Sequence, residues 1–453
     1  MAEVPGNTSP STDSWTPSVV TDKDGRVESE IGTQPAQDAV AVAGQPQRTG
    51  SSFGAFLNLI CVVIGTGSLN LPSTLKRSGW IGVLLIGVSG CIGVLSGVLV
   101  VSSLNMLSHG RLRNFNQIGY AAFGRFGRYA IYFFHLVYVI GAVGDYVILS
   151  GESFHQIASK SGHDIGKGAW KVICALVMWL ACVSLKQMSE AALLSFFGFA
   201  TSMLTIVIGV VQAFIHPYRS NGSEPAEHHA ATHDIANGSG VAVALATISF
   251  AFCAVAVMPS IETSMRRPDR WNTVVGSSMG VVTSTYLFVA IVGYWAFGDQ
   301  TTSPFLDNLP QNAATEAAKV LISLHVILAA PIIAASFAFE LESTLGITRE
   351  QMGKVKELVY RVLFRTLFFA AITGVALGIP FFGDVMSLVG AFSTSVLLCV
   401  IPTACYLKLK GWSNVRWHMR IVGVAVIALG VYICVMGAKG AIEDLRADIA
   451  NKK

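Results

Sequence analysis

The chain has 453 residues, of which 52% are apolar and only 13% are charged. Soluble domains carry about 25% charged residues, so this chain has too few charges to cover the surface of a soluble fold of its length. The composition therefore indicates a protein that lies in a lipid bilayer, and the net charge of +4 is too small to indicate a nucleic-acid partner.

The first 52 residues differ from the rest of the chain. They are rich in Ser, Thr, Pro, Gly and Asp, contain Trp15 as their only aromatic residue, and show no apolar periodicity. Such a composition is typical of a disordered segment, so we expect 1–52 to be a cytoplasmic N-terminal tail. Because it lacks the apolar core of a signal peptide, the first membrane helix is expected to act as the targeting signal.

After residue 52, apolar runs long enough to cross about 30 Å of hydrocarbon alternate with short polar segments. The eleven runs are 53–75, 80–107, 128–152, 169–184, 189–215, 240–263, 272–297, 315–340, 355–378, 384–407 and 416–438. Their apolar character is continuous rather than alternating, which favours helices over a lipid-facing β-barrel. We predict an all-α polytopic membrane protein with eleven transmembrane helices over 53–438 and a short C-terminal tail at 439–453.

The distribution of Lys and Arg predicts the orientation. Most of the 31 basic residues fall on one side if the N-terminus is cytoplasmic, so the positive-inside rule places the C-terminus outside or in a lumen. The loop 216–239 then lies on the far side, where Asn221 and Asn237 of two Asn-Gly-Ser sequons are candidates for glycosylation. Both a plasma membrane and a vacuolar or vesicular membrane fit this orientation.

The first apolar run is interrupted near its middle by Ile64-Gly-Thr-Gly-Ser68. A glycine inside a helix costs about 1 kcal/mol of stability relative to alanine. Two glycines in an uninterrupted span would therefore cost about twice as much. An unwound segment at this depth exposes amide groups that suit a carboxylate and carbonyl groups that suit an ammonium or another cation. The break therefore predicts a binding site, and close helix packing through small residues is the alternative.

Two features indicate an internal repeat. The sixth run is interrupted by Pro259, and Gly119-Tyr-Ala-Ala-Phe-Gly124 after the second run matches Gly293-Tyr-Trp-Ala-Phe-Gly298 at the end of the seventh. Transporters are often built from two inverted repeats whose first helices are both interrupted. The two repeats and the extra helix are expected at 53–215, 240–407 and 416–438.

Short motifs are dispersed over residues 53–407. They are Asn58, Ile64-Gly-Thr-Gly-Ser-Leu-Asn-Leu-Pro72, Gly79-Trp80, Ala122-Phe-Gly124, Met258-Pro-Ser-Ile261, Met265-Arg-Arg-Pro268, Phe297-Gly-Asp299 and Pro380-Phe-Phe-Gly-Asp384. This pattern resembles the amino acid/auxin permease family, with its vacuolar and vesicular-type amino acid transporters, in the leucine-transporter-like superfamily.

The resemblance implies a leucine-transporter-like fold of five plus five helices with an eleventh added. It also implies an amino acid bound at mid-membrane between the first and sixth helices. By position, the residues that would meet the substrate carboxylate and amine are Gly65, Thr66, Gly67 and Ser68. Those that would line the facing break are Phe250, Phe252, Cys253 and Ala254.

Two departures from the family pattern affect these expectations. Cys61 stands where sodium-coupled members commonly have Asn, and because sodium prefers oxygen ligands, protons become the expected coupling ion. Ala254-Val255 stands where many members have a small residue followed by His, so the side-chain chemistry at the second break differs from theirs.

Proton coupling requires a group that changes its protonation at membrane depth. Asp145 is the favoured candidate, because it lies within the third run and no cation is near it in the sequence. His135 lies nearer the middle of the same run, and His325 lies within the eighth. Ser336, also in the eighth run, could complete a weak cation site.

We therefore predict a secondary active transporter that moves small neutral amino acids by alternating access, coupled to protons. A sodium-coupled carrier and a membrane amino-acid sensor that signals through its cytoplasmic tail are the alternatives. A channel fits less well, because the sequence has no ring of repeated filter residues. The absence of a phosphate-binding loop, a nucleophile elbow and metal-ligand spacing argues against an enzyme, a cofactor or a metal site.

Overall fold

The computed structural model describes residues 48, 50–106, 111–112, 114–162, 164–185, 192–217, 231–347, 349–378 and 382–451. Its α-helices are α2 (Ser52–Val63), α3 (Thr66–Ser78), α4 (Ile81–Leu104), α5 (Phe115–Lys160), α6 (Lys167–Ser184), α7 (Ala192–Ile215), α8 (Val241–Ala251), α9 (Met258–Ser264), α10 (Trp271–Phe297), α11 (Ala313–Thr344), α12 (Arg349–Gly378), α13 (Phe382–Val389), α14 (Ile401–Lys410), α15 (Trp417–Tyr432) and α16 (Ala438–Asn451). The π-helical segments η5 (Gly390–Thr394) and η6 (Val396–Val400) connect α13 to α14, and η8 (Ile433–Gly437) connects α15 to α16.

Within the described ranges, the only β-structure is an isolated bridge between Gly50 and Met265. Nine helices of this part of the chain are long and apolar enough to cross a membrane, and the bent pair α2–α3 makes a tenth span. The predicted all-α polytopic class is therefore confirmed. The count of eleven spans stays a prediction, because the sixth run consists of the two short helices α8 and α9.

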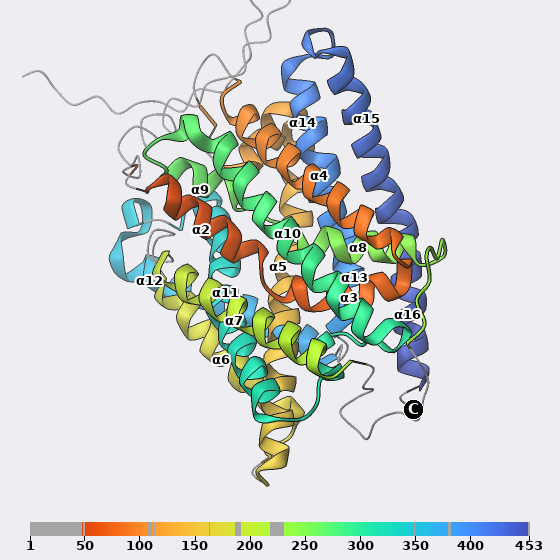
Figure 1. Ribbon diagram of the computed structural model, residues 1–453. Coiled ribbons are helices and arrows are strands. Elements are labelled where there is room, and N and C mark those ends of the chain that lie inside the picture. The colour runs from red at the N-terminus through yellow and green to blue at the C-terminus, as the bar shows by residue number, and fades with distance from the viewer. Residues whose placement is uncertain are drawn as a thin grey trace, which may run out of the picture. The chain divides into compact units, whose positions relative to one another are not determined.

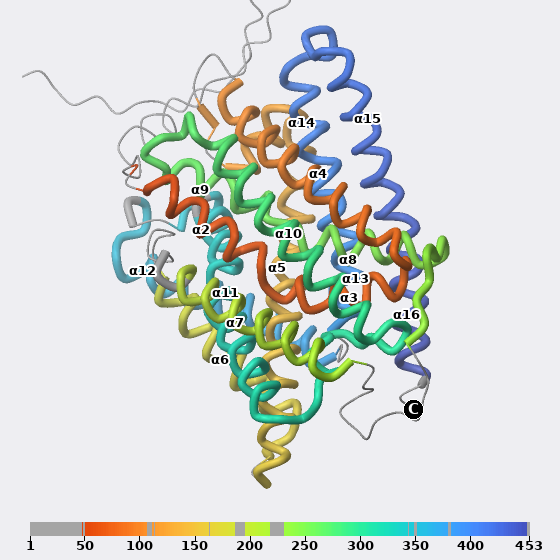
Figure 2. Tube along the Cα trace, viewed as in Figure 1, coloured from red at the N-terminus to blue at the C-terminus, as the bar shows by residue number. Residues whose placement is uncertain are grey.

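The first predicted run is broken where its glycines lie. Helix α2 ends at Val63, α3 begins at Thr66, and their axes differ by 49°. The Ile64 amide donates to the Ile60 carbonyl and ends α2, while the Ser68 hydroxyl donates to the Gly65 carbonyl at 2.8 Å inside the first turn of α3. The predicted break is confirmed, and it can be followed in the tube trace (Figure 2).

The second break lies before the proline that the sequence analysis names as the interruption. Helix α8 ends at Ala251 and α9 begins at Met258, so residues 252–257 form the break. Pro259 lies in the first turn of α9, where its missing amide proton costs no helical hydrogen bond. The proline therefore starts the second half of the broken helix rather than interrupting it.

The two matching hexapeptides end in the same backbone conformation. Phe123 has φ −135° and Gly124 φ +63°, while Phe297 has φ −120° and Gly298 φ +50°. Glycine adopts positive φ without the penalty of a side chain, which explains the last letter of both copies. In the first repeat this conformation forms a kink within α5. This helix begins at Phe115, well before the predicted start at residue 128.

Burial separates central from peripheral spans. Helices α5 and α11 and the segment from α13 to α14 are the most buried spans, whereas α6, α12 and α15–α16 are mostly exposed. The exposed faces carry large apolar side chains such as Leu180, Leu367 and Ile421, as expected of surfaces that lipid covers. Helices α14 and α15 lie side by side at one edge of the bundle (Figure 1).

The last helix is longer than predicted. From Trp417 the chain continues through α15, η8 and α16 to Asn451, so residues 439–451 of the predicted tail are helical. On the inner side of the bundle, α3 packs directly against α8 and α10, and α2 packs against α7 and α10. These contacts bring the two breaks together.

Candidate functional site

A small cavity lies where the two breaks meet. Its lining residues come from α2, α3, α5, α8 and the second break, and they are Val62, Val63, Thr66, Gly67, Tyr138, Ala142, Tyr146, Phe250, Ala251 and Cys253. The cavity measures about 10 Å³, which is on the order of the space that one water molecule needs. The site is therefore closed around its own side chains, and the breaks must separate before a ligand the size of an amino acid can enter.

Four of the eight predicted substrate residues line this cavity. Thr66 and Gly67 reach it from the start of α3, next to the first break. Phe250 reaches it from the end of α8, and Cys253 from the second break. They come from positions almost 190 residues apart in the chain, so the predicted juxtaposition of the two breaks is present in the structure. None of the ten lining residues carries a charge.

The other four predicted substrate residues lie beside the cavity without lining it: Gly65, Ser68, Phe252 and Ala254. The Ser68 hydroxyl donates a hydrogen bond to the Gly65 carbonyl. The ring of Phe252 packs edge-on against Tyr286, with the ring centroids 5.1 Å apart. The Ala254 carbonyl accepts the amide of Val257 at 3.1 Å, which turns the chain within the second break. Their contact with substrate stays a prediction.

Gly67 also serves helix packing. A Cβ atom at this position would lie 2.7 Å from the Ala251 Cβ and 2.8 Å from the Ala251 Cα. Because real Cβ atoms do not approach so closely, any larger residue would push α3 away from α8. Close packing, the alternative considered for the glycines, is therefore present at Gly67, and contact of this residue with substrate stays a prediction.

Tyrosines that the sequence analysis did not single out satisfy the carbonyl groups of both breaks. The Tyr286 hydroxyl lies 2.5 Å from the Val63 carbonyl oxygen and 3.0 Å from that of Ala251, so it bridges the ends of α2 and α8. The Tyr138 hydroxyl donates to the Cys253 carbonyl at 3.0 Å. A tyrosine in the middle of an apolar run needs a partner for its hydroxyl, and this signal was available in the sequence.

The three predicted ion-coupling residues have different surroundings. Asp145 is fully buried on α5 beside Thr66 of the first break, and neither carboxylate oxygen makes a well-formed hydrogen bond to a described residue. His135 lies with its Nδ1 3.5 Å from a carboxylate oxygen of Glu340. Ser336 donates to the Ile333 carbonyl of its own helix at 2.7 Å. Of the three, only Asp145 adjoins the breaks.

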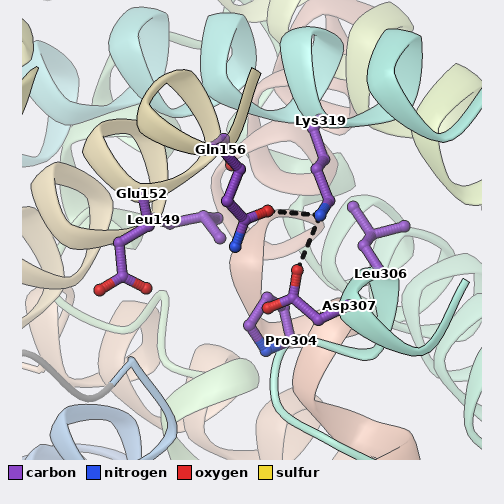
Figure 3. Close-up of a pocket in the computed structure, with 8 residues that line it drawn as sticks. Leu149, Glu152, Gln156, Pro304, Leu306, Asp307 and Lys319 are labelled. Carbon is purple, nitrogen blue, oxygen red and sulfur yellow. Dashed lines mark hydrogen bonds and ion pairs between the residues drawn. The ribbon is translucent and has the colours of Figure 1, made fainter. Parts of the chain in front are cut away.

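A second cavity lies where α5 ends and α11 begins, and we call it the rim (Figure 3). It is lined by Leu149, Glu152, Ser153, Gln156, Pro304, Leu306, Asp307 and Lys319. Lys319 of α11 is almost fully buried, and its Nζ lies 2.8 Å from an Asp307 carboxylate oxygen and 2.5 Å from the Gln156 amide oxygen. These contacts fasten the 3₁₀ turn η4 (Phe305–Asn308) to both helices and compensate the buried charge of the lysine.

The two predicted glycosylation sites differ in what the structure describes. Asn221 lies outside the described residues. Asn237 lies before the start of α8, where its side-chain oxygen accepts the Ser239 hydroxyl at 2.7 Å and the Ser239 amide at 3.2 Å. Glycosylation stays a prediction at both positions.

Comparison with known sequences points to amino acid transport. The family described as "Transmembrane amino acid transporter protein" matches residues 48–443. The chain is 28% identical to amino acid transporter AVT1C of Arabidopsis thaliana over 419 residues, which cover 90% of this chain and 72% of that protein. It is 26% identical to amino acid transporter AVT1J of the same plant over 391 residues, which cover 84% of this chain and 88% of that protein.

Solved structures show the same fold. The chain is similar to Mhp1, a nucleobase-cation-symport-1 family transporter, in a closed conformation with bromovinylhydantoin bound, with a TM-score of 0.55, 13% identity and coverage of 88% and 93% of the two chains. The inward-facing conformation of Mhp1 gives a TM-score of 0.52 at 14% identity, with coverage of 88% and 91%. The predicted leucine-transporter-like fold is thereby confirmed.

Proposed function

This chain belongs to the transmembrane amino acid transporter family and has a secondary-transporter fold. We propose that it carries neutral amino acids across its membrane and that a proton gradient drives this transport. It is a multi-pass membrane transporter of amino acids and not an enzyme, as the sequence analysis predicts. The substrate selectivity, the coupling ion and the residues that bind the substrate and the ion are what we propose.

The uncharged lining of the cavity carries the proposal of a neutral substrate. A charged substrate side chain would be buried there without a counter-charge, which costs several kcal/mol in a dry site. The hydroxyl groups of Thr66, Tyr138 and Tyr146 are the polar side chains in the lining, and the other lining side chains are apolar. This arrangement suits a zwitterionic main chain that the backbone recognises and a small apolar or hydroxylated side chain.

Both charged groups of an amino acid have a counterpart at the first break. No side chain caps the N-terminus of α3, which presents the positive end of the helix dipole to a carboxylate. The C-terminus of α2 presents carbonyl oxygens to an ammonium group. We propose that Gly65, Thr66, Gly67 and Ser68 supply these backbone contacts, while Phe250 and Cys253 face the substrate side chain.

The choice of protons over sodium rests on the groups beside the breaks. Cys61, which offers a thiol where sodium would need an oxygen ligand, is fully buried on α2. Two titratable side chains, Asp145 and His325, flank the first break and are completely buried. A group that gains and loses a proton at this depth would couple proton movement to the opening of the breaks.

The orientation of the protein in the membrane is proposed from the distribution of Lys and Arg along the chain. With the N-terminus in the cytoplasm, the rim faces the extracellular or lumenal side, and its Lys319–Asp307 ion pair closes the site toward that side. Asn237 lies on the same side in this orientation. Protease protection of tags at the two ends of the chain in sealed vesicles tests the arrangement, which requires the two tags to behave oppositely.

Transport itself is tested with the purified full-length protein in proteoliposomes. Labelled neutral, acidic and basic amino acids are offered under a pH gradient, under a sodium gradient and without a gradient. We expect neutral amino acids to accumulate only under the pH gradient and a protonophore to abolish the accumulation. Sodium-driven accumulation would refute proton coupling, and absence of accumulation of any amino acid under both gradients would refute the carrier.

A further inference from the structure

His325 connects two helices at the centre of the bundle. It lies on α11 with no exposed surface, and its Nδ1 is 2.8 Å from the Gly198 carbonyl oxygen and 2.7 Å from the Ser202 hydroxyl oxygen, both on α7. On the other side of the ring, a Cβ atom at Gly65 would lie 2.8 Å from Nε2. The imidazole therefore spans the gap between α7 and the first break.

The partners of Nδ1 determine the tautomer of the neutral ring. The Gly198 carbonyl can only accept a hydrogen bond. The Ser202 hydroxyl donates its proton to the Ile64 carbonyl at 3.2 Å, so toward the histidine its oxygen also acts as an acceptor. Both partners require the proton on Nδ1, and the lone pair of the neutral ring is therefore on Nε2.

Nε2 lacks a hydrogen-bond partner among the described residues, although it is fully buried. Buried polar atoms are almost always paired, so an unpaired one at a helix break indicates a functional role. The Tyr146 hydroxyl lies 3.5 Å from the same Cβ position at Gly65, so it flanks the spot that Nε2 faces. The lone pair is thus directed at the backbone that moves when the break opens.

The groups around His325 are uncharged on most sides. The thiol of Cys61 approaches from α2, and the phenol of Tyr146 approaches from α5, with Asp145 as its neighbour in the chain. Helix α7 contains no titratable residue. The nearest charge on α11 toward the rim is Lys319, which pairs with Asp307.

Helix α6 also packs against α11 and carries the buried Lys171. The Nζ of this lysine donates to the Ala376 carbonyl of α12 at 3.1 Å and lies 4.0 Å from Glu152, so its charge is directed away from the break. Asp145 is therefore the only carboxylate that the described contacts place close to His325.

We propose that Nε2 of His325 takes up and releases the coupling proton, an inference that rests on the proposed proton-coupled function. The proton adds to the lone pair of Nε2 and gives an imidazolium that keeps its proton on Nδ1, and loss of the Nε2 proton restores the neutral ring. The Gly198 and Ser202 acceptors stabilise the charged form. Because Nε2 faces the break and not α7, proton access depends on the position of α2 and α3 against α11.

The test separates proton coupling from amino acid binding. In proteoliposomes, His325→Gln is expected to reduce pH-driven accumulation at least tenfold, because an amide does not take up a proton in this pH range. Exchange of internal for external amino acid needs no net proton movement, and we expect it to be retained. His155→Gln, at the half-exposed end of α5, is the matched control and is expected to keep both activities.

The outcomes distinguish the two proposals. If the unmodified protein transports but ignores the pH gradient, proton coupling itself is wrong, whichever residue is altered. If the unmodified protein is coupled and His325→Gln accumulates normally, only the assignment to His325 is overturned, and Asp145→Asn then identifies the alternative carrier.

A second variant covers the case in which His325→Gln loses exchange as well. Ser202→Ala removes one acceptor of the Nδ1 proton and so destabilises the imidazolium. The pH at which uptake is half-maximal is then expected to move to a lower value, while the uptake at the optimum changes less. An unchanged pH profile in Ser202→Ala would overturn the assignment in that case.

Discussion

The two breaks that meet at the cavity are built differently. The first comprises only Ile64 and Gly65, and Gly67 in the first turn of α3 allows this helix to lie against Ala251 of α8. The second comprises six residues, 252–257, which are all apolar and buried and include no glycine. The Cys253 carbonyl in this break accepts a hydrogen bond from Tyr138 on α5, and the Ala251 carbonyl just before the break accepts one from Tyr286 on α10.

This difference shows two ways to interrupt a helix in a bilayer. In the first break the chain itself makes the close approach possible, through the absence of a side chain. The second break has no glycine, and a hydroxyl group of a surrounding helix donates to its unwound backbone at Cys253, where lipid offers no donor. The first break should therefore be sensitive to added volume, and the second to the loss of a hydroxyl group.

The largest effect is expected from Gly67→Val. Its Cβ would overlap Ala251, so α3 and α8 would be forced apart and transport should fall to background while the chain still inserts in the membrane. Gly87→Val is the matched control, because a Cβ at Gly87 meets nothing within 4 Å. Uptake in proteoliposomes and the amount of protein in the membrane fraction are measured. Normal uptake by Gly67→Val would disprove the close-approach argument.

A smaller loss is expected from Tyr286→Phe. The change leaves the carbonyls of Val63 and Ala251 without their shared donor, and each buried unpaired acceptor costs about 1–3 kcal/mol. We expect a lower melting temperature and an uptake rate reduced roughly tenfold, since about 1.4 kcal/mol corresponds to that factor. A variant with unchanged stability would show that the hydroxyl does not hold the two breaks together.

Tyr138→Phe affects one carbonyl, that of Cys253, and its effect should be smaller. The expected cost is about 1–2 kcal/mol, and because Tyr138 lines the cavity, we expect KM for the amino acid to rise more than the maximal rate falls. Tyr129→Phe is the control on the same helix, since that side chain is mostly exposed. Equal effects of the two variants would contradict a specific role of Tyr138 at the second break.

The smallest effect is expected from Ala256→Gly in the second break. If tyrosines and packing hold this segment, an added glycine costs only its extra freedom in the unfolded chain, about 0.5–1 kcal/mol. Uptake should stay within about twofold of the unmodified protein, a small fraction of the loss expected at Gly67. A loss as large as that of Gly67→Val would remove the distinction between the two breaks.

Much of this architecture was predictable because membrane insertion leaves strong signals in composition. Apolar runs mark the spans, and glycines inside one of them mark a break, since they are costly in an uninterrupted helix. The repeated hexapeptide was predictable as a repeat, and the positive φ of Gly124 and Gly298 explains its last letter. The kink that extends α5 back to Phe115 was not predictable, because the polar residues before the kink resemble a loop.

The composition of the cavity was predictable only in part. Thr66, Gly67, Phe250 and Cys253 follow from the position of the breaks, whereas Tyr138, Ala142 and Tyr146 line the cavity because of the rotation of α5 about its axis. That rotation is set by packing of α5 against α11 and α6, which the local sequence of α5 does not specify.

The sequence by itself determined that this protein lies in a bilayer, that its first helix is broken, and that few ionisable groups lie at membrane depth, because each of these depends on residue type and local spacing. Only the tertiary structure decided that Asp145 and His325 lie beside the first break with side-chain atoms that have no hydrogen-bond partner among the described residues. The partners of His325 are 123 and 127 residues away on α7, so they hold the imidazole only once α7 and α11 have packed together. A charged fraction of 13% identifies the lipid bilayer as the solvent of this chain. The direction of the lone pair on Nε2 of His325 depends instead on how the helices pack.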